Sequence, residues 1–243
     1  VSTGDCASFN FSYARDTNRE AVDENFRRAA GVFGTTSDAF VCSDQTHTTN
    51  IRRVEKEDAG KGVTKEKDYR DVDGLITNVP GLILGTFYAD CVPLLFVDPV
   101  HHAIGCSHSG WRGTVGEMGK KTVEAMREAY GSLPEDIFAA IGPSICQDCY
   151  EVGKDVAEPF EKLFSQERYQ DVSMENILTE KVNGKYQLDL WRANEAILLS
   201  TGILKEHLSM TDICTCCNPS YLFSHRASKG KRGNLAAFLM LKQ

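Results

Sequence analysis

The chain lacks the features of a secreted, membrane-spanning or nucleic-acid-binding protein. Its 27 basic residues are outnumbered by 34 acidic ones, and the formal net charge of −7 argues against a general affinity for nucleic acid or anionic membranes. The most apolar stretch, from Leu82 to Val97, is interrupted by Asp90 and is too short to span a bilayer. The segment that begins at Val1 has neither the basic region nor the apolar stretch of a secretory signal. We therefore expect a soluble, cytoplasmic protein.

The nine cysteines do not follow the spacing of a small disulfide scaffold. An odd number of cysteines in a chain of 243 residues favours reduced thiols. Two cysteine clusters, at residues 146–149 and 214–217, can be assembled into a four-thiolate zinc site. Cys146 and Cys149 form a C-x-x-C pair, whereas the second cluster is interpreted as lacking that spacing. We therefore expect all nine cysteines to be reduced, and no second zinc centre formed by Cys146, Cys149, Cys216 and Cys217.

Hydrophobic spacing and capping residues predict helices that alternate with strands. The expected helices span approximately residues 17–34, 114–131, 153–166 and 189–201. The expected strands lie within residues 73–108, 138–141 and 234–241. Because antiparallel strand pairs alternate with helices, we expect an α/β (mixed α+β) protein in which mixed parallel and antiparallel sheets are flanked by helices. No obvious linker divides the chain, so residues 1–243 are expected to form a single compact domain.

Three residues that are far apart in the chain can bind one metal ion: His47, Cys91 and His108. Zinc is held by imidazole nitrogen and thiolate sulfur, and a catalytic zinc has only three protein ligands so that water or substrate takes the fourth position. Taken singly, a buried cysteine or a lone histidine is more often structural. A thiolate–imidazole pair of Cys91 and His108 that performs nucleophilic catalysis without a metal is the other interpretation.

A predicted hairpin brings two of these residues together. The apolar runs 93–97 and 103–106 are separated by turn-forming residues and are typical of two antiparallel strands. If the turn centres at residues 99–100, Cys91 and His108 lie opposite each other. Their β-carbons are then about 4.5–5.5 Å apart, close enough to share one ion. Local pattern does not show that His47 joins them.

Arg112 is a candidate for binding an anion beside His108. It precedes a helix expected to begin at Thr114, and helix N-termini and arginine side chains both bind oxyanions. The sequence therefore predicts a metal site with an adjacent oxyanion pocket. The alternative is that Arg112 forms an ion pair with a carboxylate of the fold.

Two other segments carry polar candidates. Asp90 is adjacent to Cys91 and is a candidate acid/base or substrate-orienting group, or else a support for a metal ligand. The glycine-containing basic segment 229–233 either reaches an anionic substrate or is a solvated loop.

Several motifs together resemble the laccase-domain, YfiH-type family, whose members are described both as multicopper polyphenol oxidases and as purine nucleoside phosphorylases with adenosine deaminase activity. The motifs occur in the family's order and are Asp73-Gly74-Leu75-Ile76-Thr77, Ala89-Asp90-Cys91-Val92-Pro93-Leu94, His108-Ser109-Gly110-Trp111-Arg112-Gly113-Thr114, Ile141-Gly142-Pro143-Ser144-Ile145, Tyr150-Glu151-Val152-Gly153 and Phe223-Ser224-His225-Arg226. The family usually has Ala at the position of Ser109, and a second Arg at the position of Ala227.

The resemblance implies zinc bound by His47, Cys91 and His108 in an enzyme that acts on purine nucleosides. In phosphorolysis, phosphate attacks the ribose anomeric carbon, and in deamination a metal-activated water attacks purine C6. Catalytic candidates are then Asp90 and Arg112. Substrate-binding candidates are Gln45, which lies two residues before His47, and Ser109 and Arg226 of the matched motifs.

The expected partners are a purine nucleoside and phosphate, with no nucleic acid and no membrane, and the chain is expected to be a monomer or small homo-oligomer. Alternatives are a copper-dependent polyphenol oxidase (laccase-like), a Cys-His hydrolase and a non-enzymatic zinc-binding protein. Six histidines are too few for a conventional multicopper cluster.

Overall fold

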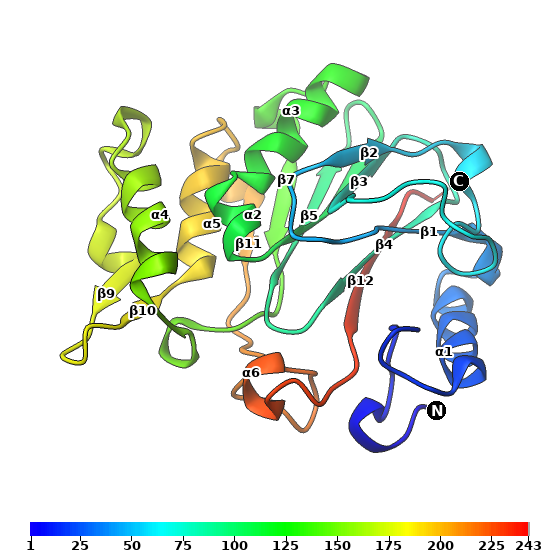
Figure 1. Ribbon diagram of the computed structural model, residues 1–243. Helices are drawn as coiled ribbons and strands as arrows, with labels where there is room; N and C mark the ends of the chain where they lie inside the picture. The colour runs from blue at the N-terminus through cyan, green and yellow to red at the C-terminus, as the bar shows by residue number, and fades with distance from the viewer. Residues whose placement is uncertain (243) are drawn as a thin grey trace.

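A mixed six-stranded sheet forms the centre of the molecule in the computed structural model, which describes residues 1–242 (Figure 1). Its strand order is β11-β7-β5-β6-β3-β2. The central antiparallel pairs bury long apolar side chains, and parallel pairs extend both edges. Its strands are β2 (Ile51–Arg53), β3 (Gly74–Thr77), β5 (Val92–Asp98), β6 (Ala103–Ser109), β7 (Phe138–Ile141) and β11 (Leu208–Met210).

The remaining strands of the described residues form two three-stranded sheets. One has the order β1-β4-β12 and the other the order β8-β10-β9. The first sheet comprises β1 (Phe40–Cys42), β4 (Ile83–Tyr88) and β12 (Leu235–Met240), and the second comprises β8 (Glu151–Val152), β9 (Leu178–Glu180) and β10 (Tyr186–Leu188). Parallel β1–β4 and antiparallel β4–β12 pairing makes the first sheet mixed as well.

Helices cover these sheets on opposite sides of the molecule (Figure 1). They are α1 (Arg19–Val32), α2 (Trp111–Val115), α3 (Met118–Tyr130), α4 (Lys154–Phe164), α5 (Leu190–Leu199) and α6 (His225–Ser228). Apolar residues of α3, α4 and α5 pack with β5 and β7 in the largest core cluster. The α1 helix packs on β1, β4 and β12 through a separate cluster centred on Phe26, Phe40 and Ile83.

The single domain with mixed sheets and flanking helices confirms the predicted fold class. The helices expected near residues 17–34, 153–166 and 189–201 are present as α1, α4 and α5, and the strands expected at 138–141 and 234–241 are present as β7 and β12. No helix within residues 1–242 is long and apolar enough to cross a membrane.

The prediction of one continuous helix that begins at Thr114 is wrong. The helix begins earlier, and it is interrupted. The chain forms α2 from Trp111 to Val115 and begins α3 at Met118. The break occurs where Glu117 adopts φ 59°. The Glu117 carboxylate does not cap the preceding turn, because it accepts hydrogen bonds from Tyr169 and Arg168 at 2.5 and 2.8 Å.

The predicted hairpin exists, but its register is shifted by two residues. Pro93, not Cys91, pairs with His108. The turn centres between residues 100 and 101, one position later than expected, and one carboxylate oxygen of Asp98 accepts the backbone N–H groups of Val100 and His101 within it at 2.8 and 3.0 Å. Cys91 therefore lies just before β5 instead of within a strand pair.

Candidate metal centre

The three predicted metal ligands come together at one end of the central hairpin. One ligand atom each from His47, Cys91 and His108 lies within 4.8 Å of the others. The Cys91 Sγ atom is 4.0 Å from His47 Nε2, and the two imidazole centroids are 5.0 Å apart. These donors are those that zinc prefers, and three of them leave a position open. The arrangement therefore fits a catalytic metal ion.

Asp73, to which the sequence pattern assigned no role, organises two of the three ligands. Its buried carboxylate contacts His108 Nδ1 at 2.8 Å. It also accepts backbone N–H groups of Thr46, His47 and Thr48 at 2.9–3.1 Å. This orientation leaves His108 Nε2 as the ligand atom. The carboxylate also holds the His47 backbone at φ 66°, a conformation that non-glycine residues seldom adopt.

The electrostatics of the cluster favour a thiolate at Cys91. Burial alone raises the pKa of this thiol, but His108 and His47 outweigh that effect and lower the pKa to about 6. Burial similarly opposes ionisation of Asp73, yet its hydrogen bonds to His108 and to the backbone of Thr46 and Thr48 lower the pKa of its carboxyl group. A thiolate is the form of cysteine that binds a metal. The protein thus presents an anionic sulfur to the cluster.

Gly110 provides the space that the ligands occupy. A β-carbon at this position would be 3.0 Å from Cys91 Sγ and 3.1 Å from His47 Cδ2. Gly110 follows β6 and is the N-cap of α2, with an ordinary φ of −77°. The absence of a side chain there thus makes room for Cys91 and His47 and does not serve an unusual backbone conformation.

We expect Gly110→Ala to lower zinc affinity roughly tenfold while the fold is retained, because the new methyl group displaces two ligands but meets no backbone strain. Zinc competition against a chromogenic chelator measures the affinity, and circular dichroism reports the fold. Gly113→Ala is the matched control, since its β-carbon would approach no heavy atom closer than 3.4 Å. Equal zinc affinities in the two variants would contradict this role of Gly110.

A cavity of about 440 Å³ opens beside the three ligands. Its lining includes the aromatic rings of Phe87 and Tyr88 and three cationic side chains: Arg15, Lys67 and Arg232. Burial lowers the pKa of Arg232, and its Nε lacks a hydrogen-bond partner within residues 1–242. Sequence analysis had placed this arginine only in a basic loop. The cavity thus places aromatic and cationic side chains beside the three candidate ligands, although Lys67 forms an ion pair with Asp44, which also lines the cavity.

Asp90 and Arg226 are hydrogen-bonded to each other next to Cys91. The Asp90 carboxylate accepts the Thr215 hydroxyl and the Arg226 backbone N–H, both at 2.7 Å. The Arg226 guanidinium donates to the backbone carbonyl groups of Cys149 and Glu151 at 3.1 and 3.0 Å. Asp90 adopts φ 88°. These contacts connect three loops next to Cys91 and fix the entry to β5.

The remaining sequence candidates lie in three different settings. Gln45 lines the cavity, and its amide exchanges hydrogen bonds with the Phe87 backbone at 2.6 and 2.7 Å. Ser109 is fully buried, and its hydroxyl contacts Thr114 and Asn194 at 3.0 Å. Arg112 is exposed and stacks 4.2 Å above the Trp111 ring. Of these three, the structure brings Gln45 to the cavity beside the ligands.

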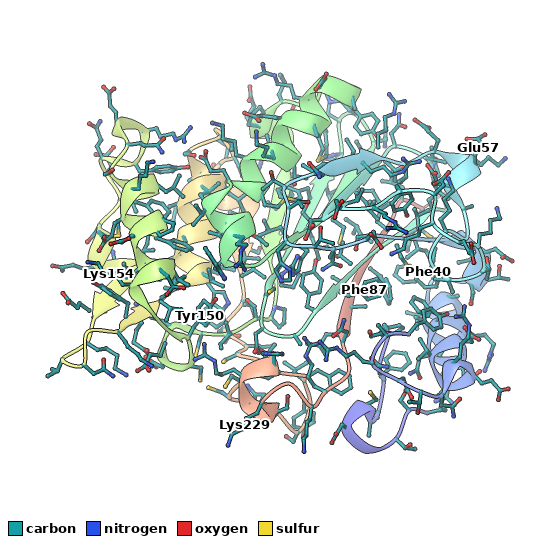
Figure 2. The ribbon with its side chains drawn as sticks, in the orientation of Figure 1. Phe40, Glu57, Phe87, Tyr150, Lys154 and Lys229 are labelled. Carbon is teal, nitrogen blue, oxygen red and sulfur yellow. The ribbon has the colours of Figure 1, made fainter. Side chains whose placement is uncertain are left out.

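Tyr150 is a second residue whose role sequence reasoning missed. Burial raises the pKa of its hydroxyl, as do the charges of Cys91 and Asp90, whereas Arg226 and Arg112 lower it. The guanidinium carbon of Arg226 lies 5.3 Å from the centre of the Tyr150 ring. In Figure 2, Tyr150 lies near α4, whereas Phe87 lies on the β1-β4-β12 sheet, to which it belongs. The sequence signal that could have identified Tyr150 was its position in the Tyr150-Glu151-Val152-Gly153 motif.

The cysteines depart from the sequence-based expectation. All nine are free thiols in the structure, but Cys146, Cys149, Cys214 and Cys217 form a second group whose sulfur atoms lie within 4.8 Å of one another. Cys214 and Cys217 have the same C-x-x-C spacing as the first pair, so the premise that excluded this cluster was wrong. The chain therefore contains two clusters whose geometry suits a metal.

Comparison with known proteins places this site in a family. The model of the family described as "Multi-copper polyphenol oxidoreductase laccase" matches residues 1–242. The chain belongs to this family. The match covers both candidate metal clusters and every element that surrounds them, and it agrees with the resemblance carried by the sequence motifs.

Characterised relatives are named for purine chemistry. The chain is 35% identical to the purine nucleoside phosphorylase YlmD of Bacillus subtilis, over 95% of this chain and 81% of that protein. It is 36% identical to the adenosine deaminase RL5 of an unknown prokaryotic organism, over 88% and 79% of the two chains. The crystal structure of YlmD from Geobacillus stearothermophilus superimposes with a TM-score of 0.90 at 33% identity, over 100% of this chain and 88% of that one.

Proposed function

We propose that the protein is a zinc-dependent purine nucleoside phosphorylase that cleaves adenosine- or inosine-type nucleosides with phosphate and can also deaminate adenosine. The observation that carries the proposal is the His47, Cys91 and His108 cluster beside a cavity with aromatic and cationic walls. The names of the relatives supply the substrate class. Zinc at this cluster, when bound, supplies a Lewis acid that polarises an oxygen of the substrate or activates water.

The residues of the chain have separate tasks in this proposal. The aromatic face of Phe87 packs against the planar purine, and Gln45 holds that wall by pairing with the Phe87 backbone. Arg112 binds phosphate from the side of α2, and the unpaired Nε of Arg232 offers a donor in the cavity. Asp90 is a positioning residue, because both of its carboxylate oxygens already accept hydrogen bonds.

Ser109 and Arg226 act through the loops they join. Ser109 connects the end of β6 to α5 through Asn194, and this keeps Gly110 close to the ligands. Arg226 joins the loop before β8 to Asp90. In the proposal, these two residues contribute to substrate binding indirectly, because they maintain the shape of the site.

A copper-dependent phenol oxidase is the weaker candidate despite the family description. Two of the six histidines, His47 and His108, belong to the three-ligand cluster. A His₂Cys copper site normally has a distant axial methionine, whereas no methionine is among the residues that line the cavity. The three donors also satisfy the requirements of a catalytic zinc without further ligands.

We expect Arg112→Ala to slow phosphate-dependent cleavage of inosine roughly ten- to a hundredfold, since losing a charge-assisted hydrogen bond to the anion costs about 1.5–3 kcal/mol. The measurement is hypoxanthine release as phosphate concentration is varied. Zinc content stays unchanged, because Arg112 contacts none of the three ligands in the described structure. Arg112→Lys keeps the charge but loses the planar fork, and an intermediate rate is expected.

An Arg112→Ala enzyme with wild-type dependence on phosphate would remove Arg112 from the anion site. The same assay on Arg232→Ala then decides whether the cavity arginine binds the anion instead. If the wild-type protein neither cleaves nor deaminates purine nucleosides and oxidises phenols with bound copper, the proposed function is wrong.

A further inference from the structure

We infer that Cys146, Cys149, Cys214 and Cys217 form a second, structural zinc site that is independent of the His47, Cys91 and His108 cluster. The two C-x-x-C pairs are 68 residues apart in sequence, yet Cys149 Sγ and Cys217 Sγ are 3.4 Å apart. All four sulfur atoms lie within 4.8 Å of one another. A regular ZnS₄ tetrahedron with Zn–S distances of about 2.3 Å has sulfur–sulfur edges of about 3.8 Å. The cluster is therefore close to the size of a filled site.

Hydrogen bonds hold Cys214 in place within the cluster. The backbone N–H groups of Cys146 and Cys217 both point at Cys214 Sγ, with donor–acceptor distances of 3.3 and 3.4 Å. The first of these contacts ties the two C-x-x-C pairs to each other. Four soft sulfur ligands in a closed set select zinc over the oxygen-preferring cations, and four protein ligands leave no position for a substrate.

The apolar core does not account for the cluster. Cys217 is exposed and Cys146 and Cys149 are half-buried, whereas cysteines that serve as small apolar side chains are usually buried. The 3.4 Å separation of Cys149 and Cys217 is longer than a disulfide bond of about 2.05 Å. A bound ion explains why four thiols converge when only Cys214 among them is buried.

The site joins two loops that support the catalytic cluster. Thr215, within the second pair, donates to Asp90, and Arg226 connects the carbonyl group of Cys149 to the same carboxylate. Direct backbone pairing between the loops includes Thr215 N–H to the Ser144 carbonyl group at 3.0 Å. An ion held by both loops thus fixes Asp90, which is adjacent to Cys91.

The test compares metal content and thermal stability in matched variants of the full chain. The double variant Cys149→Ser/Cys217→Ser is expected to contain one zinc fewer per chain than wild type and to unfold roughly 5–10 °C lower. The control is Cys216→Ser, because Cys216 is adjacent to Cys217 but lies outside the cluster. It is expected to keep the wild-type zinc content and unfolding temperature. Zinc content and unfolding temperature are measured without any enzymatic assay, so the result does not depend on whether the protein cleaves nucleosides.

Thiol labelling tests the same inference in the wild-type protein, in case the double variant fails to fold. In zinc-replete protein, maleimide is expected to modify Cys216 much faster than Cys149 or Cys217, and a strong chelator is expected to remove the difference. Equal labelling before chelation would overturn the site, as would unchanged metal content in a folded double variant. Iron in place of zinc, or a disulfide detected as a loss of two hydrogens in the intact mass, would also overturn it.

Discussion

Cys91→Ala is expected to abolish both phosphorolysis and deamination, with losses of at least about a thousandfold, because both reactions rely on a metal whose electrostatic stabilisation is worth several kcal/mol. Zinc content falls by one ion per chain. Removing the thiolate leaves two imidazoles, His47 and His108, which no longer neutralise the ion or define three corners of a tetrahedron. Elemental analysis and assays of inosine cleavage and adenosine deamination measure the three effects.

Cys106→Ala is the matched control, since Cys106 is a buried thiol on β6 outside both metal clusters. It is expected to lower stability but to keep the zinc content and activity of the folded protein. An activity assay of the metal-free wild-type protein tests the remaining alternative, in which catalysis needs no metal. If it retains full activity while Cys91→Ala does not, Cys91 is a nucleophile paired with His108 and the metal hypothesis is wrong.

The sequence predicted which three side chains converge more reliably than the geometry that brings them together. Cys91 and His108 were expected to be a directly opposed strand pair. The observed register instead pairs His108 with Pro93. Cys91 reaches the cluster from just outside β5, where Gly110 leaves room for its sulfur. The error arose in the turn, because the hydrogen bonds of Asp98 to the following backbone are a tertiary detail that apolar periodicity does not encode.

The helices α1, α4 and α5 could be predicted because each has a strong apolar periodicity that its own packing satisfies. The break between α2 and α3 could not, since Glu117 is recruited by Tyr169 from a distant segment. The four-cysteine cluster could have been found, because the two C-x-x-C spacings are visible in the sequence. Their convergence across 68 residues depends on the fold. Contacts of this kind, between loops far apart in the chain, are the part that local pattern leaves undetermined.

Asp73→Asn is expected to weaken zinc binding at the catalytic cluster about 10- to 100-fold, although Asp73 is not itself a ligand. Its Oδ1 contacts His108 Nδ1 and the His47 N–H, and its Oδ2 accepts the N–H groups of Thr46 and Thr48. An asparagine amide replaces one of these oxygens with an NH₂ group, which faces backbone donors or the imidazole N–H instead of accepting from them. The loop that holds His47 at φ 66° then loses part of its support.

The control for this substitution is Asp71→Asn. Asp71 is exposed, and its side chain accepts the Thr46 hydroxyl at 2.7 Å, an interaction that the oxygen of asparagine can keep. Its φ of 56° is also tolerated by asparagine. Zinc affinity measured by chelator competition should fall in Asp73→Asn and stay close to wild type in Asp71→Asn. Because the loss acts through the metal, added zinc should restore much of the kcat of Asp73→Asn. Equal affinities in the two variants, or a rate that zinc does not restore, would show that Asp73 acts only on stability or directly on substrate.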